Sequence, residues 1–314
     1  MSKPDASCRG HVLSANGRKR PPVPEVRSPT LRRRELGALL RNFRQERGMT
    51  VEQVARHLLC SPSKVSRMET GHRGATLRDV RDLCKFYGLP DAQADRIMSL
   101  AREGRQQGWW QACELAYFAT YVGLEQAATS LRYFQSSTIP GLLQTEDYAR
   151  AMLQAGLPAE FTPERADELV KVRLRRQHVL TREPPMQLKA ILDEAVLHRA
   201  VGGPDAMGAQ LDHLVETVKK MPNVTLQLIP FAAGAHPAMD SNFTLLDFEV
   251  APSVVYVEGL MGWLYIERPQ EIVRYRQIAD YLHSVALDSE DTIGLIREIR
   301  ERYNRGSTCA SHNA

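Results

Sequence analysis

The sequence predicts a mainly α-helical chain with an α+β domain on its C-terminal side. Two observations support this fold class. Residues 31–106 repeat a pattern of a polar capping residue, an amphipathic segment and a glycine, which is typical of five short helices. Residues 107–305 combine helical segments with stretches in which apolar residues alternate or run together, as in β-strands. We therefore expect a helical N-terminal domain at 31–106 and a mixed helix and sheet domain at 107–305.

The two ends of the chain have a different composition from the rest. Residues 1–30 are rich in Pro, Ser, Arg and Gly and show little periodicity, which predicts a disordered basic leader. Residues 306–314 form a polar tail. The 314 residues are enough for about two domains.

Charge is distributed unevenly along the chain. Residues 1–90 contain 19 Lys and Arg against 8 Asp and Glu, a net charge of +11, whereas the other residues carry 22 against 29, or −7. Basic tails are common and often inert, but here the excess continues into the segment that is predicted to fold. A basic front with an acidic rear indicates that the front contacts a polyanion such as nucleic acid.

Other bulk features exclude several classes of protein. No apolar run approaches the ~20 residues of a membrane span, so we expect no membrane partner. The five cysteines are scattered and form no CxxC pair, which argues for reduced thiols in the cytoplasm and against a disulfide framework or a zinc site. We expect neither a metal nor a cofactor.

The first two helices are predicted from their stripes and caps. Residues 31–47 place Leu36, Leu40 and other apolar side chains on one face, and Gly48 ends the segment. Thr50 then opens a second helix, and Gln53 completes a capping box with it. A tight turn leads to the third helix.

The third helix, at residues 61–70 (SPSKVSRMET), is the candidate for reading DNA. Ser61 caps it and Pro62 suits its first turn, while Val65 and Met68 face a core. The outward side chains are short polar groups with one Lys and one Arg, which suit base edges and phosphates. A helix of this kind is more often a plain solvated face, so the interpretation depends on the flanking helices. Two more helices follow, beginning near Thr76 and near residue 91.

The segments TVEQVARHL, SPSKVSRMETG and LRDVRDLCKFYGL resemble the Xre or phage-repressor type of helix-turn-helix domain. Ala55 stands where that family has a small residue between crossing helices. One position departs from the family, because Leu59 occupies the turn position that is usually Gly. A Leu with positive φ would cost about 1 kcal/mol, so the turn is expected to be strained or rearranged.

The predicted DNA contacts fall into three groups. Side chains on the third helix contact bases or phosphates, the start of the second helix faces the DNA backbone, and two further arginines add charge against phosphates. The residues are Arg41, Thr50, Gln53, Ser61, Ser63, Lys64, Ser66, Arg67 and Arg73.

The C-terminal domain is expected to alternate helices with strands. The predicted strands are 129–135, 186–193, 224–230, 243–249, 253–259 and 262–267, and the clearest helices are 145–153, 205–221, 269–286 and 289–303. Residues 194–201 fit either a helix or an extended turn.

Several segments of this domain carry a second resemblance, among them IPGLLQTEDYARAML, LDEAVLHRAVGGPDAM and PNVTLQLIPFAAGAHP. They resemble the C-terminal domain of a large actinobacterial family, abundant in streptomycetes, whose members are described as antitoxin-like or helix-turn-helix transcriptional regulators. Members are often encoded beside a small partner protein. The resemblance implies regulation of transcription and supplies no chemistry for this domain.

No motif for phosphate-loop, dinucleotide, zinc-protease or serine-hydrolase chemistry is present, so no catalytic residue is predicted. We interpret Asp193, which precedes Glu194 after a strand, as the cap of the next segment and not as part of a catalytic carboxylate pair. The loop 231–242 is a candidate ligand or partner site, although a plain hairpin loop fits equally well. The candidate residues there and on the nearby strands are His236, Asp240, Asn242, Trp263 and Tyr265.

Together these features predict a cytoplasmic regulator that binds double-stranded DNA and is associated with the nucleoid when bound. A homodimer is expected, because one recognition helix reads too few base pairs. The C-terminal domain would dimerise, sense a small-molecule effector or bind a small protein encoded by an adjacent gene. Two alternatives remain, namely an antitoxin-like partner binder that only autoregulates its operon, and a DNA-tethered enzyme.

Overall fold

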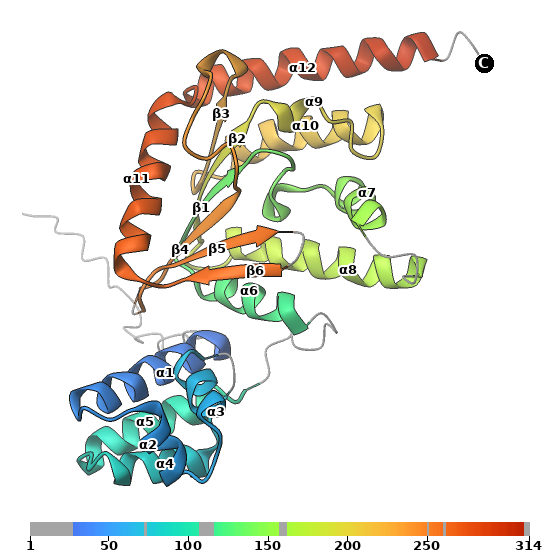
Figure 1. Ribbon diagram of the computed structural model, residues 1–314. Coiled ribbons are helices and arrows are strands. Elements are labelled where there is room, and N and C mark those ends of the chain that lie inside the picture. The colour runs from blue at the N-terminus through green and yellow to red at the C-terminus, as the bar shows by residue number, and fades with distance from the viewer. Residues whose placement is uncertain are drawn as a thin grey trace, which may run out of the picture.

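The computed structural model describes residues 28–71, 74–106, 116–156, 162–249, 251–259 and 262–310. Its N-terminal part is a bundle of five helices, and its C-terminal part is a six-stranded mixed sheet with helices on both faces (Figure 1). The predicted fold class is therefore confirmed. Within the described residues, no helix is both long enough and apolar enough to cross a bilayer.

The bundle has a single apolar core to which every helix contributes. Its helices are α1 (Pro29–Glu46), α2 (Val51–His57), α3 (Pro62–Glu69), α4 (Leu77–Phe86) and α5 (Asp91–Glu103). The side chains at its centre are almost fully buried, among them Leu40, Val54, Val65, Val80 and Ile97. Burial of apolar side chains at helical spacing explains why the stripes in the sequence predicted these helices correctly.

Local capping groups define where the short helices begin and end. Thr50 and Gln53 form the predicted capping box at the start of α2, and Thr76 forms one with Asp79 at the start of α4. The Ser61 hydroxyl accepts from the backbone N–H of Lys64 at 3.2 Å, as a cap of α3 should.

The start of the bundle differs from the predicted boundary. Helix α1 begins at Pro29 and not after residue 30, so the end of the predicted leader is part of the fold. Ser28, Pro29 and Thr30 are buried, and the Ser28 hydroxyl donates to the carbonyl oxygen of Gly123. Proline suits the first turn of a helix, and contact with the second domain orders these residues.

The sheet consists of six strands in the order β3-β2-β1-β4-β5-β6. Strands β1, β2 and β3 are parallel, and β4, β5 and β6 add to β1 as antiparallel neighbours. The strands are β1 (Ser130–Gln135), β2 (Gln187–Asp193), β3 (Val224–Ile229), β4 (Phe243–Asp247), β5 (Val254–Gly259) and β6 (Gly262–Ile266). All six coincide with segments predicted as strands.

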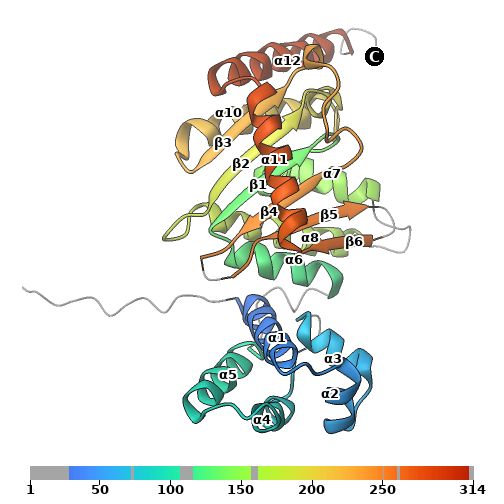
Figure 2. The same ribbon diagram turned by 60° about the vertical axis from the view of Figure 1, so that its left-hand side comes forward.

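Helices cover both faces of the sheet. The helices are α6 (Ala116–Ala127), α7 (Glu146–Gly156), α8 (Pro163–Arg176), α9 (Ala195–His198), α10 (Pro204–Lys220), α11 (Pro269–Val285) and α12 (Ser289–Ala310), with short 3-10 turns η2 (Gly141–Leu143), η3 (Gln177–Leu180) and η4 (Phe231–Ala233). Helix α11 crosses one face in Figure 2, where Ile272 and Leu282 pack with Phe134. Tyr133, which precedes Phe134 on β1, belongs to the core on the opposite face of the sheet. This alternation is the period of two expected of a strand. Helix α12 continues to Ala310, into the predicted polar tail.

The bundle contacts the second domain through α1. Helix α1 packs against α6, and both ribbon views place the bundle beside α6 and the β5–β6 pair (Figures 1 and 2). The Arg34 guanidinium pairs with Glu267 and lies 4.8 Å from the ring centroid of Tyr265 on β6. Charge pairing and the cation–ring contact fix this side of the bundle against the sheet.

The turn between α2 and α3 has the strain that the sequence predicts. Leu59 has φ of 51° and is the one non-glycine residue with positive φ among the described residues. Its side chain is 93% exposed, so little packing compensates for the backbone conformation.

Replacing Leu59 by glycine should therefore stabilise the bundle. Relief of about 1–2 kcal/mol of strain is partly offset by the larger entropy of Gly in the unfolded chain, which leaves a gain of up to about 1 kcal/mol. Thermal melts of residues 28–106 would measure it, with Leu59→Ala as the control that removes the exposed side chain and keeps Cβ. A loss of stability in the glycine variant, or an equal gain in both variants, would contradict the strain.

Candidate nucleic-acid interface

Helices α2 and α3 form a compact helix-turn-helix unit. The backbone N–H of Cys60 donates to the carbonyl oxygen of Ala55 at 2.9 Å, which closes the turn. Ala55 is buried, and its small side chain lets the two helices approach closely. The family resemblance and the geometry therefore agree on the role of this alanine.

The outer face of α3 consists of exposed polar side chains. Ser63, Ser66 and Arg67 are exposed, whereas Val65 and Met68 on the inner face are almost fully buried. The Nε atom of Arg67 donates to the carbonyl oxygen of Ser63 at 3.2 Å, so this guanidinium lies along its own helix. These groups face solvent and are the right kind to contact base edges and phosphates.

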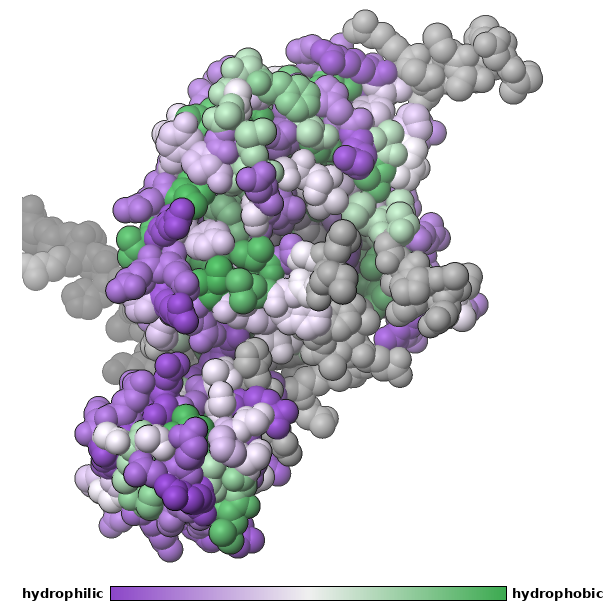
Figure 3. Space-filling view, viewed as in Figure 1, coloured by the Kyte–Doolittle hydropathy of each residue, from purple (hydrophilic) through white to green (hydrophobic). Residues whose placement is uncertain are grey.

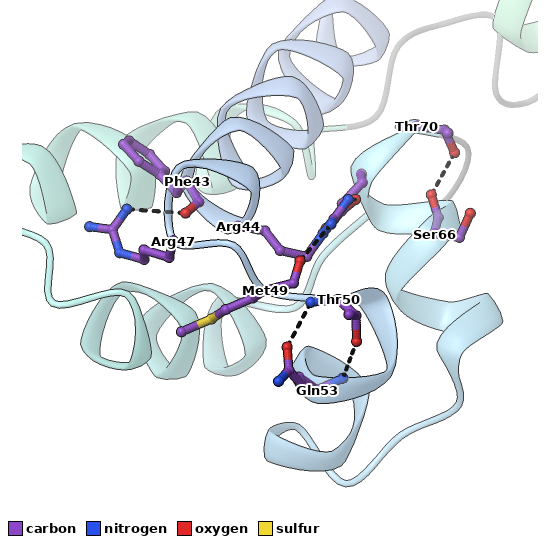
Figure 4. A network of polar contacts seen from close by, with 9 residues as sticks. Phe43, Arg44, Arg47, Met49, Thr50, Gln53, Ser66 and Thr70 are labelled. Carbon is purple, nitrogen blue, oxygen red and sulfur yellow. Dashed lines mark hydrogen bonds and ion pairs between the residues drawn. The ribbon is translucent and has the colours of Figure 1, made fainter.

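A cluster of three residues, the α1–α3 clamp, holds α3 in place: Gly37, Arg44 and Glu69. A Cβ atom on Gly37 would lie 2.5 Å from the carbonyl oxygen of Met68. The backbones of α1 and α3 are therefore in direct contact at this glycine. The Arg44 guanidinium binds both carboxylate oxygens of Glu69, at 2.7 and 2.8 Å, and donates to the carbonyl oxygen of Met49. Figure 4 shows Arg44 directed at the backbone of Met49, between α1 and α2. The hydrogen bond with Glu69 raises the pKa of Arg44, which keeps the guanidinium charged.

The sequence analysis did not predict that Arg44 pairs with Glu69. A signal was present for Glu69, which follows the buried Val65 by four residues and so lies on the inner face of α3. A carboxylate at such a position requires a cationic partner.

Lys64 differs from the other predicted contacts on α3. Its ammonium group pairs with the Asp79 carboxylate at 3.0 Å, and the side chain is only partly exposed. Burial opposes ionisation of Asp79, but hydrogen bonds from Lys64 and Thr76 lower the pKa of its carboxyl below the ordinary value. Lys64 therefore joins α3 to α4 in the free protein, and it would have to leave Asp79 to reach a base.

The start of α2 presents the other predicted contacts. Thr50 and Gln53 are exposed, and each uses its side-chain oxygen in the capping box (Figure 4). Arg41 is exposed on α1. Arg73 lies outside the described residues. The Ser61 hydroxyl is engaged as the cap of α3.

The second group of candidate residues does not form one site. His236 is mostly buried beside Asp193, with 3.6 Å between Nε2 and Oδ2, and its ring meets Phe134 edge-on. The Asp193 carboxylate also accepts from the backbone N–H of Ala195 at 2.8 Å. The N-cap residue of α9 is Glu194 and its side chain makes no capping bond, so the interpretation of Asp193 as the cap of that helix is not confirmed. Asp240 is exposed.

The remaining three residues of that group lie in different places. Trp263 is exposed on β6, and Tyr265 lies at the contact with Arg34. The Asn242 amide oxygen accepts from the backbone N–H and the hydroxyl of Ser136. Asn242 also borders a cleft on the sheet face that carries α8.

The geometry defines a helix-turn-helix protein, the class that binds DNA and regulates transcription. A family model described as a helix-turn-helix domain matches residues 35–97. A second model, described as a domain of unknown function (DUF5753), matches residues 118–298, more than half of the chain, and the chain belongs to this family. No match was found among curated proteins or among solved structures.

Arg67→Ala and Arg41→Ala should affect DNA binding differently. Loss of Arg67 from α3 should cost about 1–3 kcal/mol on the preferred duplex and relax the preference at one base pair, if the side chain reaches a base edge. Loss of Arg41 should weaken binding to preferred and scrambled duplexes alike and lower the salt slope by about one unit. Binding to both duplexes across a salt series measures the contrast. Equal losses for both variants on both duplexes would exclude α3 as the sequence reader.

Proposed function

We propose that the protein is a sequence-specific, DNA-binding regulator of transcription of the Xre type, acting in the cytoplasm on the nucleoid. The observation that supports this best is the exposed face of α3, where Ser63, Ser66 and Arg67 project from a helix held by the α1–α3 clamp. A helix of this kind in a helix-turn-helix unit enters the major groove of DNA.

Contacts to the DNA backbone would position α3 in the groove. The N-terminus of α2 has Thr50 and Gln53 exposed, and the backbone N–H groups of a helix start favour phosphate. Arg41 adds positive charge on α1. In the view of Figure 3 hydrophilic residues cover most of the bundle, which suits a polar, charged interface with DNA.

We propose further that the protein binds DNA as a homodimer through its C-terminal domain. Strand β6 is the last strand of the sheet, so its outer edge has no strand partner within the described residues. Trp263 and Leu264 on that strand are 43% and 58% exposed. An edge strand with exposed apolar side chains favours pairing with a second chain.

A partner protein is the second candidate for the same domain, as the resemblance to the antitoxin-like actinobacterial family implies. Phe231 and Met239 are exposed at the two ends of the loop between β3 and β4, and Figure 3 shows hydrophobic surface on this domain. Co-expression with the product of an adjacent gene, followed by size-exclusion chromatography, would test for a stable complex. Separate elution of the two proteins would contradict it. We propose no enzymatic activity.

Dimerisation predicts a difference in affinity between fragment and whole. Residues 28–106 should fold alone and bind the preferred duplex weakly, whereas the intact chain should bind about a hundredfold more tightly, because the second half-site is engaged at high effective concentration. Leu264→Glu should lower the affinity of the intact chain towards that of the fragment. Gel shifts with analytical ultracentrifugation measure both quantities. Equal affinity of the fragment and the intact chain for a symmetric duplex would contradict binding as a dimer.

A further inference from the structure

The C-terminal domain contains a cleft of about 320 Å³ on the sheet face that carries α8. Its volume falls within the range of about 300–1,000 Å³ that is usual for small-molecule sites. Aromatic rings, hydrogen-bonding groups and charged side chains share its walls. The lining residues include Tyr121, Tyr133, Gln144, Arg173, Tyr256 and Glu258.

One of the two arginines at the cleft is fully neutralised by the protein. The Arg176 guanidinium binds both carboxylate oxygens of Glu125, at 2.8 and 2.7 Å, and both side chains are almost completely buried. The Tyr133 hydroxyl donates to the same carboxylate and lies 2.8 Å from the hydroxyl of Tyr121. This pair with its two tyrosines forms a rigid wall of the cleft.

Arg173, one turn earlier on α8, is placed differently. Its Nη1 atom donates to the amide oxygen of Gln144 at 2.8 Å, and no carboxylate of the described residues pairs with it. A guanidinium has five N–H donors, so most of them remain for another acceptor. Burial and the nearby Arg176 lower the pKa of Arg173 to about 10, which leaves it charged at neutral pH.

A charged guanidinium that is partly withdrawn from solvent, as Arg173 is, becomes more stable when an anion pairs with it. Helix α8 could have turned Arg173 outward, as it does with Lys171 and Arg175, which are exposed. Arg173 instead continues the buried stripe of Ala166 and Val170 and borders the cleft. The protein therefore holds a cation in the wall of a cleft large enough for a small molecule.

We propose that this cleft binds a small carboxylic acid with an aromatic or apolar body, whose carboxylate pairs with Arg173. A planar carboxylate matches the guanidinium fork through two parallel hydrogen bonds. Tyr121 and Tyr256, whose rings lie 4.5 Å apart, border the cleft with their exposed edges beside the body of the ligand, and Thr138 and Asn242 offer hydrogen-bonding groups. Glu258 at the exposed end of the cleft already offsets part of the positive charge of Arg173, so the cleft suits a monoanion better than a phosphate or other dianion.

The cleft is connected to the recognition helix by direct contacts. Tyr256 on β5 pairs in register with Tyr265 on β6, and the two rings are 5.3 Å apart. Tyr265 contacts Arg34 of α1, and the backbone of Gly71, just beyond α3, is so close to Arg34 that a Cβ atom there would lie 2.9 Å from the Arg34 Cα. A ligand that moves Tyr256 would therefore shift the surface on which α3 rests. This regulatory part rests on the proposed DNA-binding function, whereas ligand binding does not.

The binding test uses the full chain and isothermal titration calorimetry with benzoate, phenylacetate and hexanoate. The uncharged amides of the three acids serve as matched controls. At least one acid should bind at millimolar or lower concentration while its amide does not. Arg173→Gln should weaken that binding at least tenfold, Arg173→Lys should weaken it less, and Lys171→Gln, which removes an exposed charge from the same helix, should leave it unchanged.

Two results would overturn the assignment of the cleft. One is that none of the three acids binds the wild-type chain, and the other is that an acid binds Arg173→Gln as tightly as wild type. Thermal melts of each variant show whether the chain is folded. Should Arg173→Gln fail to fold, the comparison of acid with amide and the weaker binding by Arg173→Lys still decide the matter.

The regulatory part is tested by DNA affinity with and without the saturating acid. The acid should change the affinity of the wild-type chain at least fivefold. Glu267→Gln breaks the pairing with Arg34 far from the cleft, so it should abolish this change and leave the calorimetric binding intact. Glu271→Gln is the control: it removes the ion pair between Glu271 and Arg268 instead, and should leave the change in DNA affinity as in the wild type.

An unchanged DNA affinity in the wild-type chain would refute the coupling. If the chain binds no DNA at all, the proposed function fails, and calorimetry still decides the ligand site.

Discussion

The exposed face of α3 depends on the α1–α3 clamp. Only glycine at position 37 permits the close approach of the two helices, and the partly buried Arg44–Glu69 pair opposes rotation of α3 about its axis. Removing Arg44 would leave the buried Glu69 carboxylate without its cationic partner, which destabilises the folded bundle. The orientation of Ser63, Ser66 and Arg67 toward solvent follows from this contact. The groups that would read DNA are therefore positioned before DNA arrives, which lowers the entropy lost on binding.

The helices and strands could be predicted because local physics determines them. Thr50 with Gln53 and Thr76 with Asp79 form capping boxes within four residues of sequence, and Leu59 has the positive φ that the turn requires. The order of the strands could not be predicted, because the parallel neighbours β1 and β2 are more than fifty residues apart and nothing local specifies their pairing. The first turn of α1 was missed for a similar reason, since the contact of Ser28 with the second domain orders it.

The candidate site residues also divide into those that local periodicity predicts and those that depend on contacts between distant segments. Ser63 and Ser66 were predicted from helical periodicity, which decides exposure without tertiary information. Lys64 has the same periodicity, but its pairing with Asp79 on another helix cannot be read from spacing. Arg173 had a signal that the sequence analysis did not use, because it lies on the same helical face as the buried Ala166 and Val170. Arginine on the apolar face of a helix indicates either a buried ion pair or a ligand for it.

The central claim is that α3 reads DNA sequence, and selection of bound duplexes from a random pool tests it most directly. The intact wild-type chain and the Arg67→Ala variant are each carried through several rounds, and the enriched sequences are compared. The account predicts a two-fold symmetric motif for the wild type, and for the variant the same motif with the preference lost at one base pair in each half-site. Enrichment of the same full motif by both chains, or of no motif by either, would contradict the claim.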